Sequence, residues 1–283
     1  MFTLSNDELV LSVLDPVADQ SLLGSRYCTG GYIWQIEDQC KGPLLTGPQY
    51  PSPTPPSFHG QGAPEAFVTP LGNADVPVGE TVTVIGVGDV VRSGNVEPFH
   101  ARDNPTVRRF CSWTVERDDR TVRMTTEQDS GECALTLTRQ VSLDGRTITS
   151  QTEVVNRCSV GLPLSWFPHP FFPPPADGRC CRFGFSWSLP ENAGYFRNDR
   201  AELCMKQEYP WRKGLFQRLD ISPGVDFSAE IAHPVVGVVS ITTDYRVDTL
   251  PVWANEVTLS PEPYLGRTVA PDERTAWRII YRF

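Results

Sequence analysis

The sequence lacks any run of about 18 uncharged apolar residues, the length that a helix needs to cross a membrane. Its start, Met1 to Glu8, has neither the basic flank nor the apolar stretch of a secretory signal peptide. It also lacks a stripe of lysine and arginine, because 34 acidic residues outnumber 25 basic ones and the formal net charge is −9. We therefore expect a cytoplasmic protein that binds neither membrane nor nucleic acid.

The usual metal-ligand spacings are missing as well. The eight cysteines form no C-x-x-C pair, and the four histidines form neither H-x-H nor H-E-x-x-H. Disulfide frameworks are typical of short secreted chains, whereas this chain has 283 residues. We expect no metal ion and free thiols throughout, with adjacent Cys180 and Cys181 serving only to pack the core.

Several nucleophile and nucleotide motifs are absent too. There is no G-x-S-x-G elbow and no Walker A loop, so the sequence supports neither an ordinary serine hydrolase nor a P-loop enzyme. The segment Gly86-Val87-Gly88 lacks the third glycine and the following helix of a dinucleotide-binding fingerprint.

The sequence is rich in short runs in which apolar and polar residues alternate, bounded by Gly, Pro, Asp or Asn. No amphipathic helical pattern lasts beyond about two turns, and 26 prolines and 22 glycines interrupt most candidates. Asp144-Gly145 between two alternating runs is a strong hairpin signal. The predicted strands are 31–36, 81–87, 107–115, 121–127, 133–141, 147–155, 181–189, 235–242, 249–253, 257–259 and 277–283.

These runs continue without a break in composition, and 40% of the residues are hydrophobic. We therefore expect one all-β domain over residues 1–283, a large antiparallel β-sandwich or a barrel-like fold. The proline-rich stretch 47–56 is expected to be a stiff loop, with an SH3-type ligand as the alternative.

Two residues clamped by prolines are candidates for proton transfer. His169 lies between two prolines, where a restricted backbone could hold an imidazole of near-neutral pKa rigidly. Glu262 also lies between prolines and precedes an aromatic residue. Ordinary alternatives stay open: His169 could be a loop histidine at a strand end, and Glu262 a surface glutamate. Sequence spacing does not show that the two residues meet.

Other candidates could hold a ligand. The glycine-rich segment 58–67 contains His59 and Glu65 and could bring backbone donors close to a ligand, or it could be a simple connection. Arg26 and Trp34 are suited to holding sugar hydroxyls and to stacking on a pyranose, although an aromatic residue in an alternating run is more often part of the core.

Taken in order, these segments resemble the aldose 1-epimerase (galactose mutarotase-like) superfamily, particularly its uncharacterised bacterial branch. The resemblance spans nearly the whole chain and rests on short motifs in the right order. The family's usual His-Tyr-Phe is His-Pro-Phe here, and the stretch from His169 to Glu262 is shorter than in typical galactose mutarotases. The matching segments are 24–33, 59–72, 85–88, 154–156, 167–172, 259–264, 270–273 and 277–283.

The resemblance implies a β-supersandwich and a mutarotase that interconverts the α and β anomers of a hexose or hexose phosphate. His169 inherits the general acid that protonates the ring oxygen, and Glu262 the base that takes the anomeric proton. No cofactor is needed, and a monomer or homodimer is expected. The implied sugar contacts are His59, Arg26, Glu65 and Trp34, with Glu65 as an alternative to His59 for the family's first histidine.

Two other functions remain open. The protein could keep the fold but only bind or sense a carbohydrate without turnover, because a fold does not dictate activity. It could also be a lyase or hydrolase acting on a longer saccharide. Whether the sugar is phosphorylated depends on a local group of arginines, for which the candidates are Arg26, Arg102, Arg108 and Arg109.

Overall fold

Strands dominate the computed structural model, which describes residues 1–52 and 59–283 and confirms the all-β prediction. Within these ranges the helical segments are three short 3-10 turns, and no helix is long and apolar enough to span a membrane. The end of the proline-rich stretch, residues 53–56, and Phe58 lie outside the described residues. The turns are η1 (Gln20–Leu22), η2 (Ala101–Asp103) and η3 (Trp211–Lys213).

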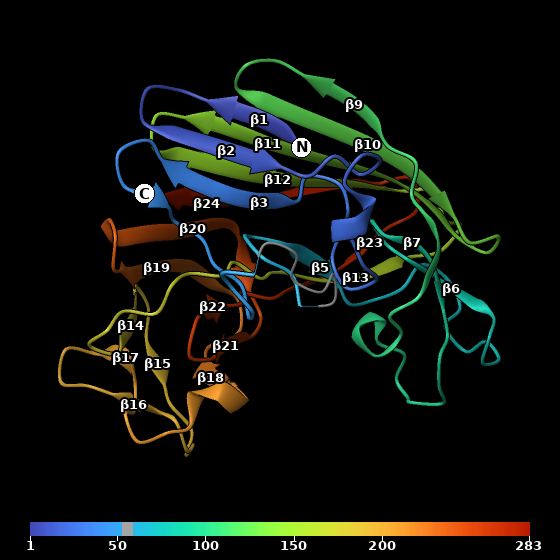
Figure 1. Cartoon of the computed structure of the whole chain (residues 1–283). Coiled ribbons are helices and arrows are strands. Elements are labelled where there is room, and N and C mark those ends of the chain that lie inside the picture. The colour runs from blue at the N-terminus through green and yellow to red at the C-terminus, as the bar shows by residue number, and fades with distance from the viewer. Residues whose placement is uncertain (53–58) are drawn as a thin grey trace.

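A ten-stranded sheet runs through the molecule (Figure 1), and its neighbouring strands all pair antiparallel. Such a sheet can bury one face and leave the other to solvent. From one edge to the other its strands are β16 (Tyr195–Arg197), β17 (Glu202–Met205), β14 (Arg179–Phe183), β19 (Val225–His233), β20 (Gly237–Val247), β24 (Arg274–Arg282), β12 (Thr147–Asn156), β11 (Ala134–Asp144), β10 (Thr121–Asp129) and β9 (Thr114–Arg117).

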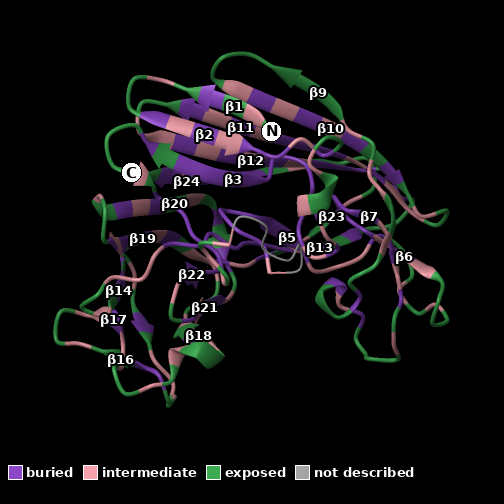
Figure 2. Ribbon diagram, viewed as in Figure 1, coloured by how far each residue is buried: buried purple, intermediate pink, exposed green. Residues whose placement is uncertain are grey.

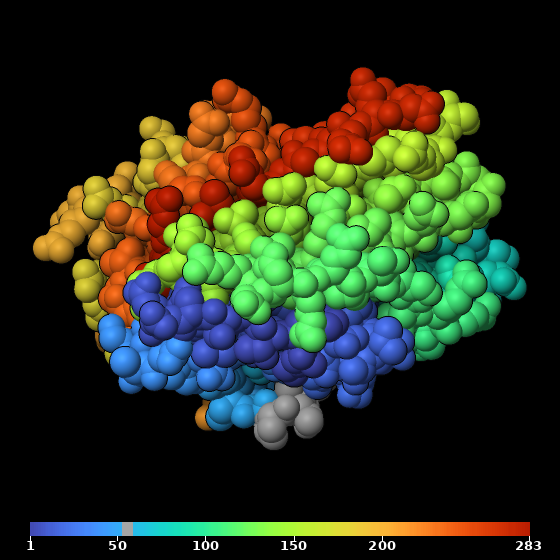
Figure 3. All heavy atoms as spheres, turned by 90° about the horizontal axis from the view of Figure 1, so that it is seen from above, coloured from blue at the N-terminus to red at the C-terminus, as the bar shows by residue number. Residues whose placement is uncertain are grey.

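A four-stranded N-terminal sheet packs against one half of the large sheet. Strand β1 contacts β10 and β11, and Figure 3 shows the N-terminal residues in blue beside the green residues of this half. Alternate residues face inward, so that Leu9 and Leu11 of β2 join Val122 and Met124 of β10 in one core. The strands of this sheet are β1 (Phe2–Ser5), β2 (Leu9–Val13), β3 (Ile33–Asp38) and β4 (Gly42–Pro43).

Three smaller sheets complete the fold, and two of them carry the candidate site. The first has the order β23 (Leu265–Val269), β13 (Leu162–Pro168), β5 (Glu65–Phe67). The second contains β15 (Trp187–Ser188), β18 (Leu215–Ile221), β21 (Leu250–Ala254) and β22 (Leu259–Pro261). The third is the meander β6 (Thr81–Val84), β7 (Gly88–Val91) and β8 (Val107–Phe110).

Period-two alternation explains the longest strands. In β10 the burial alternates between buried and partly exposed residues, as Figure 2 shows along β10 and β20. The predicted hairpin is present between β11 and β12, where Asp144 pairs with Thr147 and leaves a two-residue loop. Gly145 opens this loop with φ of +53°, a conformation that suits glycine.

Two predicted strands are each divided in the structure. Run 107–115 consists of β8, which pairs with β7, and β9, which pairs with β10. Run 181–189 consists of β14, which pairs with β19, and β15, which pairs with β18. In both cases the chain crosses from one sheet to another, and apolar alternation alone does not show such a crossing. Strands β1, β2, β4, β5, β7, β13, β16, β17, β18, β19 and β23 are not among the predicted runs.

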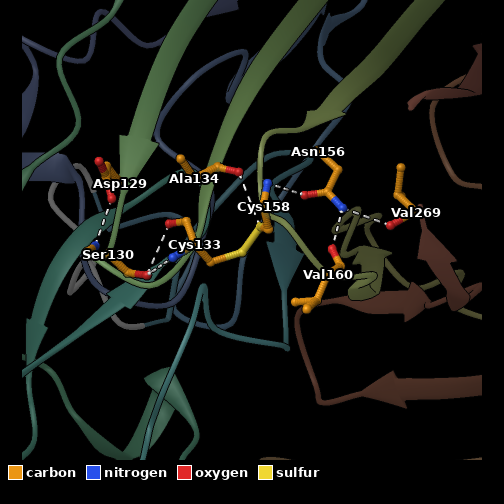
Figure 4. Close-up of a disulfide and its surroundings, with 9 residues drawn as sticks. Asp129, Ser130, Cys133, Ala134, Asn156, Cys158, Val160 and Val269 are labelled. Carbon is orange, nitrogen blue, oxygen red and sulfur yellow. Dashed lines mark hydrogen bonds between the residues drawn. A yellow bond between two sulfur atoms is a disulfide. The ribbon is translucent and has the colours of Figure 1, made fainter. Parts of the chain in front are cut away.

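The expectation of free thiols is wrong for one pair, because Cys133 and Cys158 form a disulfide with a Cα–Cα distance of 4.6 Å (Figure 4). Cys133 lies just before β11 and Cys158 just after the end of β12, and antiparallel pairing brings these ends together. Asn156 holds the second cysteine in place, since its Oδ1 accepts a hydrogen bond from the Cys158 amide. The other six cysteines are free thiols, and Cys180 and Cys181 are both buried in the core.

Candidate active site

The structure brings His169 and Glu262 together. His169 follows β13 directly and Glu262 follows β22 directly, and paired hydrogen bonds between Phe172 and Leu259 align the two segments. Atom Nε2 of His169 lies 3.4 Å from Oε1 of Glu262. The two proline-clamped residues therefore form a facing pair of titratable side chains.

Backbone hydrogen bonds and prolines fix both residues from opposite sides. The His169 amide donates to the Pro64 carbonyl at 2.8 Å, and the Glu262 amide donates to the Pro251 carbonyl at 2.9 Å. The flanking prolines have restricted φ angles and no amide hydrogen to satisfy, so they limit the backbone without leaving buried donors unpaired. This arrangement supplies the rigidity that a positioned acid or base requires.

Aromatic rings surround the pair. The exposed fractions of His169 and Glu262 are only 2% and 3%. The ring of Tyr264 stacks on Phe167 at 4.4 Å, next to the histidine. The rings nearest His169, with centroid distances, are Phe171 (4.4 Å), Phe167 (5.8 Å), Tyr27 (6.0 Å) and Trp253 (6.2 Å).

This environment changes the protonation of both groups. Burial raises the pKa of Glu262 to about 8, and the positive charge of Arg26 opposes the shift. Burial and, to a smaller extent, Arg26 hold the pKa of His169 well below its usual value. At pH 7 the carboxyl group is therefore mostly protonated and the imidazole neutral in the ligand-free structure.

Ser260 contacts the other side of the imidazole and is not among the predicted site residues. Its Oγ lies 2.7 Å from Nδ1 of His169, and its side chain is fully buried. Ser260 and Glu262 are two residues apart, the spacing that places extended-chain side chains on one face. That spacing is the sequence signal that could have identified this serine.

Arg26 and His59 are predicted as sugar contacts, and Arg26 lies close enough to the pair for its charge to act on the pKa of both His169 and Glu262. The guanidinium of Arg26 lies 5.0 Å from the centre of the Tyr27 ring. His59 is partly exposed, its carbonyl accepts a hydrogen bond from the Tyr27 hydroxyl, and burial and the charge of Arg26 lower its pKa. The structure thus places Arg26 near the pair, and it places His59 next to Tyr27 and near Arg26.

Only part of the expected arginine group gathers here. Arg102, in η2, lies close enough to Arg26 for both charges to act on the pKa values of His100 and Tyr264. A hydrogen bond from the Ser25 hydroxyl to the Ala101 carbonyl joins η2 to the segment that carries Arg26. In contrast, Arg109 forms an ion pair with Asp89 at 2.9 Å, and Arg108 donates to the Gly79 carbonyl. Arg108 and Arg109 are therefore held at the sheet formed by β6, β7 and β8.

The side chain of Glu65 is buried and has its partners in the core. Its carboxylate lies 2.6 Å from Nη1 of the buried Arg139 and accepts a hydrogen bond from Ser150. Along β5, Glu65 and Phe67 face the core, whereas Ala66 faces the aromatic cluster of Phe167. These contacts argue against a sugar contact at Glu65 and account for the residue as a structural ion pair.

Trp34 is 9% exposed and packs with Tyr32 in the aromatic cluster that includes Tyr27 and Phe171. It therefore has the packing of a core aromatic residue, the alternative considered from its alternating context. Among the described residues, no three His, Cys, Asp or Glu side chains gather where they could hold a metal ion.

Both side chains of the pair are almost fully buried. Grooves of about 650 Å³ lie over β14, β19 and β20 and over β9 and β10, and neither of these two grooves is lined by His169 or Glu262.

No protein-family model matches the chain. No curated protein matches it. Among solved structures, it is similar to a galactose mutarotase-like protein from Lactobacillus casei ATCC 334, with a TM-score of 0.63 and 14% identity, covering 100% of this chain and 99% of the other. It is also similar to a galactose mutarotase related enzyme from Lactobacillus acidophilus, with a TM-score of 0.61 and 10% identity over 100% and 97% of the two chains. An aldose epimerase homologue from C. elegans aligns with a TM-score of 0.54 and 11% identity over 99% and 97%. The chain therefore has the galactose mutarotase-like β-sandwich fold.

Proposed function

We propose that this protein is an aldose 1-epimerase that interconverts the α and β anomers of a hexose. The observation that carries the proposal is the facing pair of His169 and Glu262, 3.4 Å apart in an aromatic pocket of a galactose mutarotase-like fold. Their sequence motifs resemble the acid and base segments of that superfamily.

The reaction needs one proton donor and one proton acceptor. Protonation of the ring oxygen and removal of the proton from the anomeric hydroxyl open the hemiacetal, rotation exposes the other carbonyl face, and closure forms the other anomer. We assign the donor to His169 and the acceptor to Glu262, with Arg26 and His59 as sugar contacts. Acid/base positioning of this kind accelerates a reaction by about 10²–10⁴-fold. Only protons move, so the chemistry requires no cofactor.

The proposed mechanism requires an ionised Glu262, whereas burial favours its protonated form. Because the pKa of Glu262 is raised to about 8, only a minority of the ligand-free protein holds the ionised base at pH 7. The positive charge of Arg26 favours that ionised form. Arg26 thus has two roles in the proposal, as a sugar contact and as the charge that keeps the base from being wholly protonated.

A phosphorylated hexose is a second candidate substrate. Arg26 and Arg102 both act on Tyr264, so two guanidinium groups lie on the Tyr264 side of the pair. Guanidinium groups bind phosphate oxygens well. This local charge would attract a sugar phosphate despite the net charge of −9.

A carbohydrate-binding protein without turnover is the alternative from another class. The fold allows it, because the similarity to mutarotase-like structures is at 14% identity and a shared fold does not dictate turnover. Such a protein would bind sugar saturably and leave the rate of anomer exchange unchanged.

NMR exchange spectroscopy of the anomeric protons tests these proposals. Glucose, galactose and glucose 6-phosphate are measured with catalytic amounts of the protein and of its Glu262→Gln variant. Accelerated exchange that is lost in the variant supports the mutarotase, and the preferred sugar distinguishes the two substrates. Exchange at the buffer rate for every sugar, together with measurable binding, supports the alternative.

A further inference from the structure

We propose that Ser260 is a positioning residue that holds His169 in the tautomer with its proton on Nε2, facing Glu262. The catalytic meaning of this inference rests on the proposed function. The tautomer itself can be measured whether or not the protein turns over a sugar.

The contact that carries the proposal is short and fully enclosed. Ser260 Oγ lies 2.7 Å from Nδ1 of His169, and the exposed fractions of the two residues are 0% and 2%. On the opposite edge of the ring, Nε2 faces the Glu262 carboxyl at 3.4 Å. Two side chains from one short segment therefore flank the imidazole, and turning the ring over would break its hydrogen bond to Ser260.

The direction of the hydrogen bond follows from the number of hydrogens. A serine hydroxyl has one hydrogen, and leaving it unbonded in the protein interior is unfavourable. Within the described part of the chain, Nδ1 is the acceptor that the structure provides for the Ser260 hydroxyl. Serine therefore donates and Nδ1 accepts. The single proton of a neutral imidazole is then on Nε2.

The tautomer matters because the ring is neutral at pH 7, since burial and Arg26 lower the pKa of His169. A fully protonated imidazolium would have donors on both nitrogens, but a neutral ring has only one. With the proton on Nε2, His169 can donate to a sugar oxygen placed beside Glu262. With the proton on Nδ1, Nε2 could only accept, and the proposed acid would be lost. Neutral imidazoles are known to act as such hydrogen-bond donors in catalysis.

Nitrogen NMR of protein labelled with ¹⁵N-histidine tests the tautomer directly. The signals of His169 are identified by their loss in His169→Gln. We expect a protonated Nε2 and an unprotonated Nδ1 in the unsubstituted protein, and a shift of the population toward protonated Nδ1 in Ser260→Ala. A protonated Nδ1 in the unsubstituted protein would overturn the proposal, and so would an unchanged tautomer in Ser260→Ala.

Kinetics test the positioning role separately. We expect Ser260→Ala to lower kcat by about 10- to 100-fold with little change in KM, as is usual when an orienting hydrogen bond is lost. Ser260→Thr retains the hydroxyl and should recover most of kcat. Thr258→Val is the matched control, because Thr258 is another fully buried hydroxyl close by, which accepts from Thr46 and donates to the Phe172 carbonyl but does not bond to the histidine. This control should lower stability while leaving the tautomer and kcat nearly unchanged.

The two proposals can fail independently. If the unsubstituted protein does not accelerate anomer exchange, the proposed function fails and the NMR tautomer still decides the role of Ser260. If exchange is accelerated and Ser260→Ala retains full kcat, the function stands and the positioning role is overturned.

Discussion

Nε2 of His169 and Oε1 of Glu262 lie 3.4 Å apart, although one residue follows β13 and the other follows β22, strands of two different sheets. The hydrogen bonds between Phe172 and Leu259 join these sheets next to the pair. Both side chains are thereby enclosed by aromatic rings, and this burial changes their pKa values. The consequences can be measured.

Glu262→Gln should reduce the rate of anomer exchange by about 10²–10⁴-fold, because the amide keeps the shape of the side chain but cannot take a proton. Anomeric-proton exchange measures the rate, and circular dichroism checks that the variant is folded. Full activity in the folded variant would remove Glu262 from the mechanism.

Activity should depend on pH through Glu262. Because the base must be ionised and its pKa is raised to about 8, kcat/KM should increase by about tenfold per pH unit below pH 8 and level off above it. Arg26→Met should move this curve to higher pH, since the charge of Arg26 lowers the pKa of the carboxyl. A profile that falls as pH rises toward 8 would instead indicate that Glu262 acts in its protonated form.

The free energy of unfolding should also depend on pH through Glu262, and this contribution should decrease as pH rises. The folded protein holds the proton of Glu262 between the ordinary pKa of 4.5 and about 8, whereas the unfolded chain has released it. The contribution of Glu262 to the free energy of unfolding is therefore fully present below pH 4.5, decreases as pH rises and is lost above about 8. Urea unfolding at several pH values measures it as the difference from Glu262→Gln, which lacks the titration. We expect a change on the order of a few kcal/mol; a pH-independent difference would contradict the raised pKa.

Arg102→Met should weaken the use of a phosphorylated hexose and spare the neutral sugar. Arg102 is 57% exposed in its side chain, so the loss in KM for glucose 6-phosphate should be modest, about three- to tenfold. KM values for glucose and glucose 6-phosphate measure this difference. Arg109→Met is the control, because Arg102 and Arg109 each pair with a neighbouring aspartate, Asp103 and Asp89, but only Arg102 acts on Tyr264 beside the pair. Equal effects of both variants would refute a local phosphate contact.

Glu65→Gln should destabilise the protein by about 3–5 kcal/mol, because it leaves Arg139 as a buried charge without its carboxylate. Replacing both partners, as in Glu65→Gln with Arg139→Met, should restore part of the loss. Urea unfolding measures the two variants. If Glu65→Gln remained stable and instead raised KM for the sugar, Glu65 would be a sugar contact after all.

Because Cys133 and Cys158 form a disulfide, we expect a thiol titration to find six thiols in the unreduced, denatured protein and eight after reduction. Replacing Cys133 and Cys158 by serine should lower the free energy of unfolding by about 3 kcal/mol, the typical effect for a separation of 25 residues. Anomer exchange in the folded variant should be unchanged. Eight thiols without reduction would contradict the bond.

Local patterns were sufficient to predict much of this protein. Period-two alternation identified strands such as β10, β11 and β12, because one face of each is buried and the other is not. The Asp-Gly pair identified the hairpin, since its turn requires a positive φ. The prolines around His169 and Glu262 marked two rigid positions, and the resemblance to galactose mutarotases suggested what they do.

Other features were decided only by the tertiary structure, because they depend on which strands become neighbours. Alternation shows that Glu65 and Ala66 point to opposite faces, but only the packing shows that Glu65 meets Arg139. Strand pairing likewise joins Cys133 to Cys158, residues that no spacing rule connects. The contact of Ser260 with His169 also arises where two sheets meet. A period of two assigns each side chain to a face, whereas the neighbour across that face is set by the topology of the whole chain.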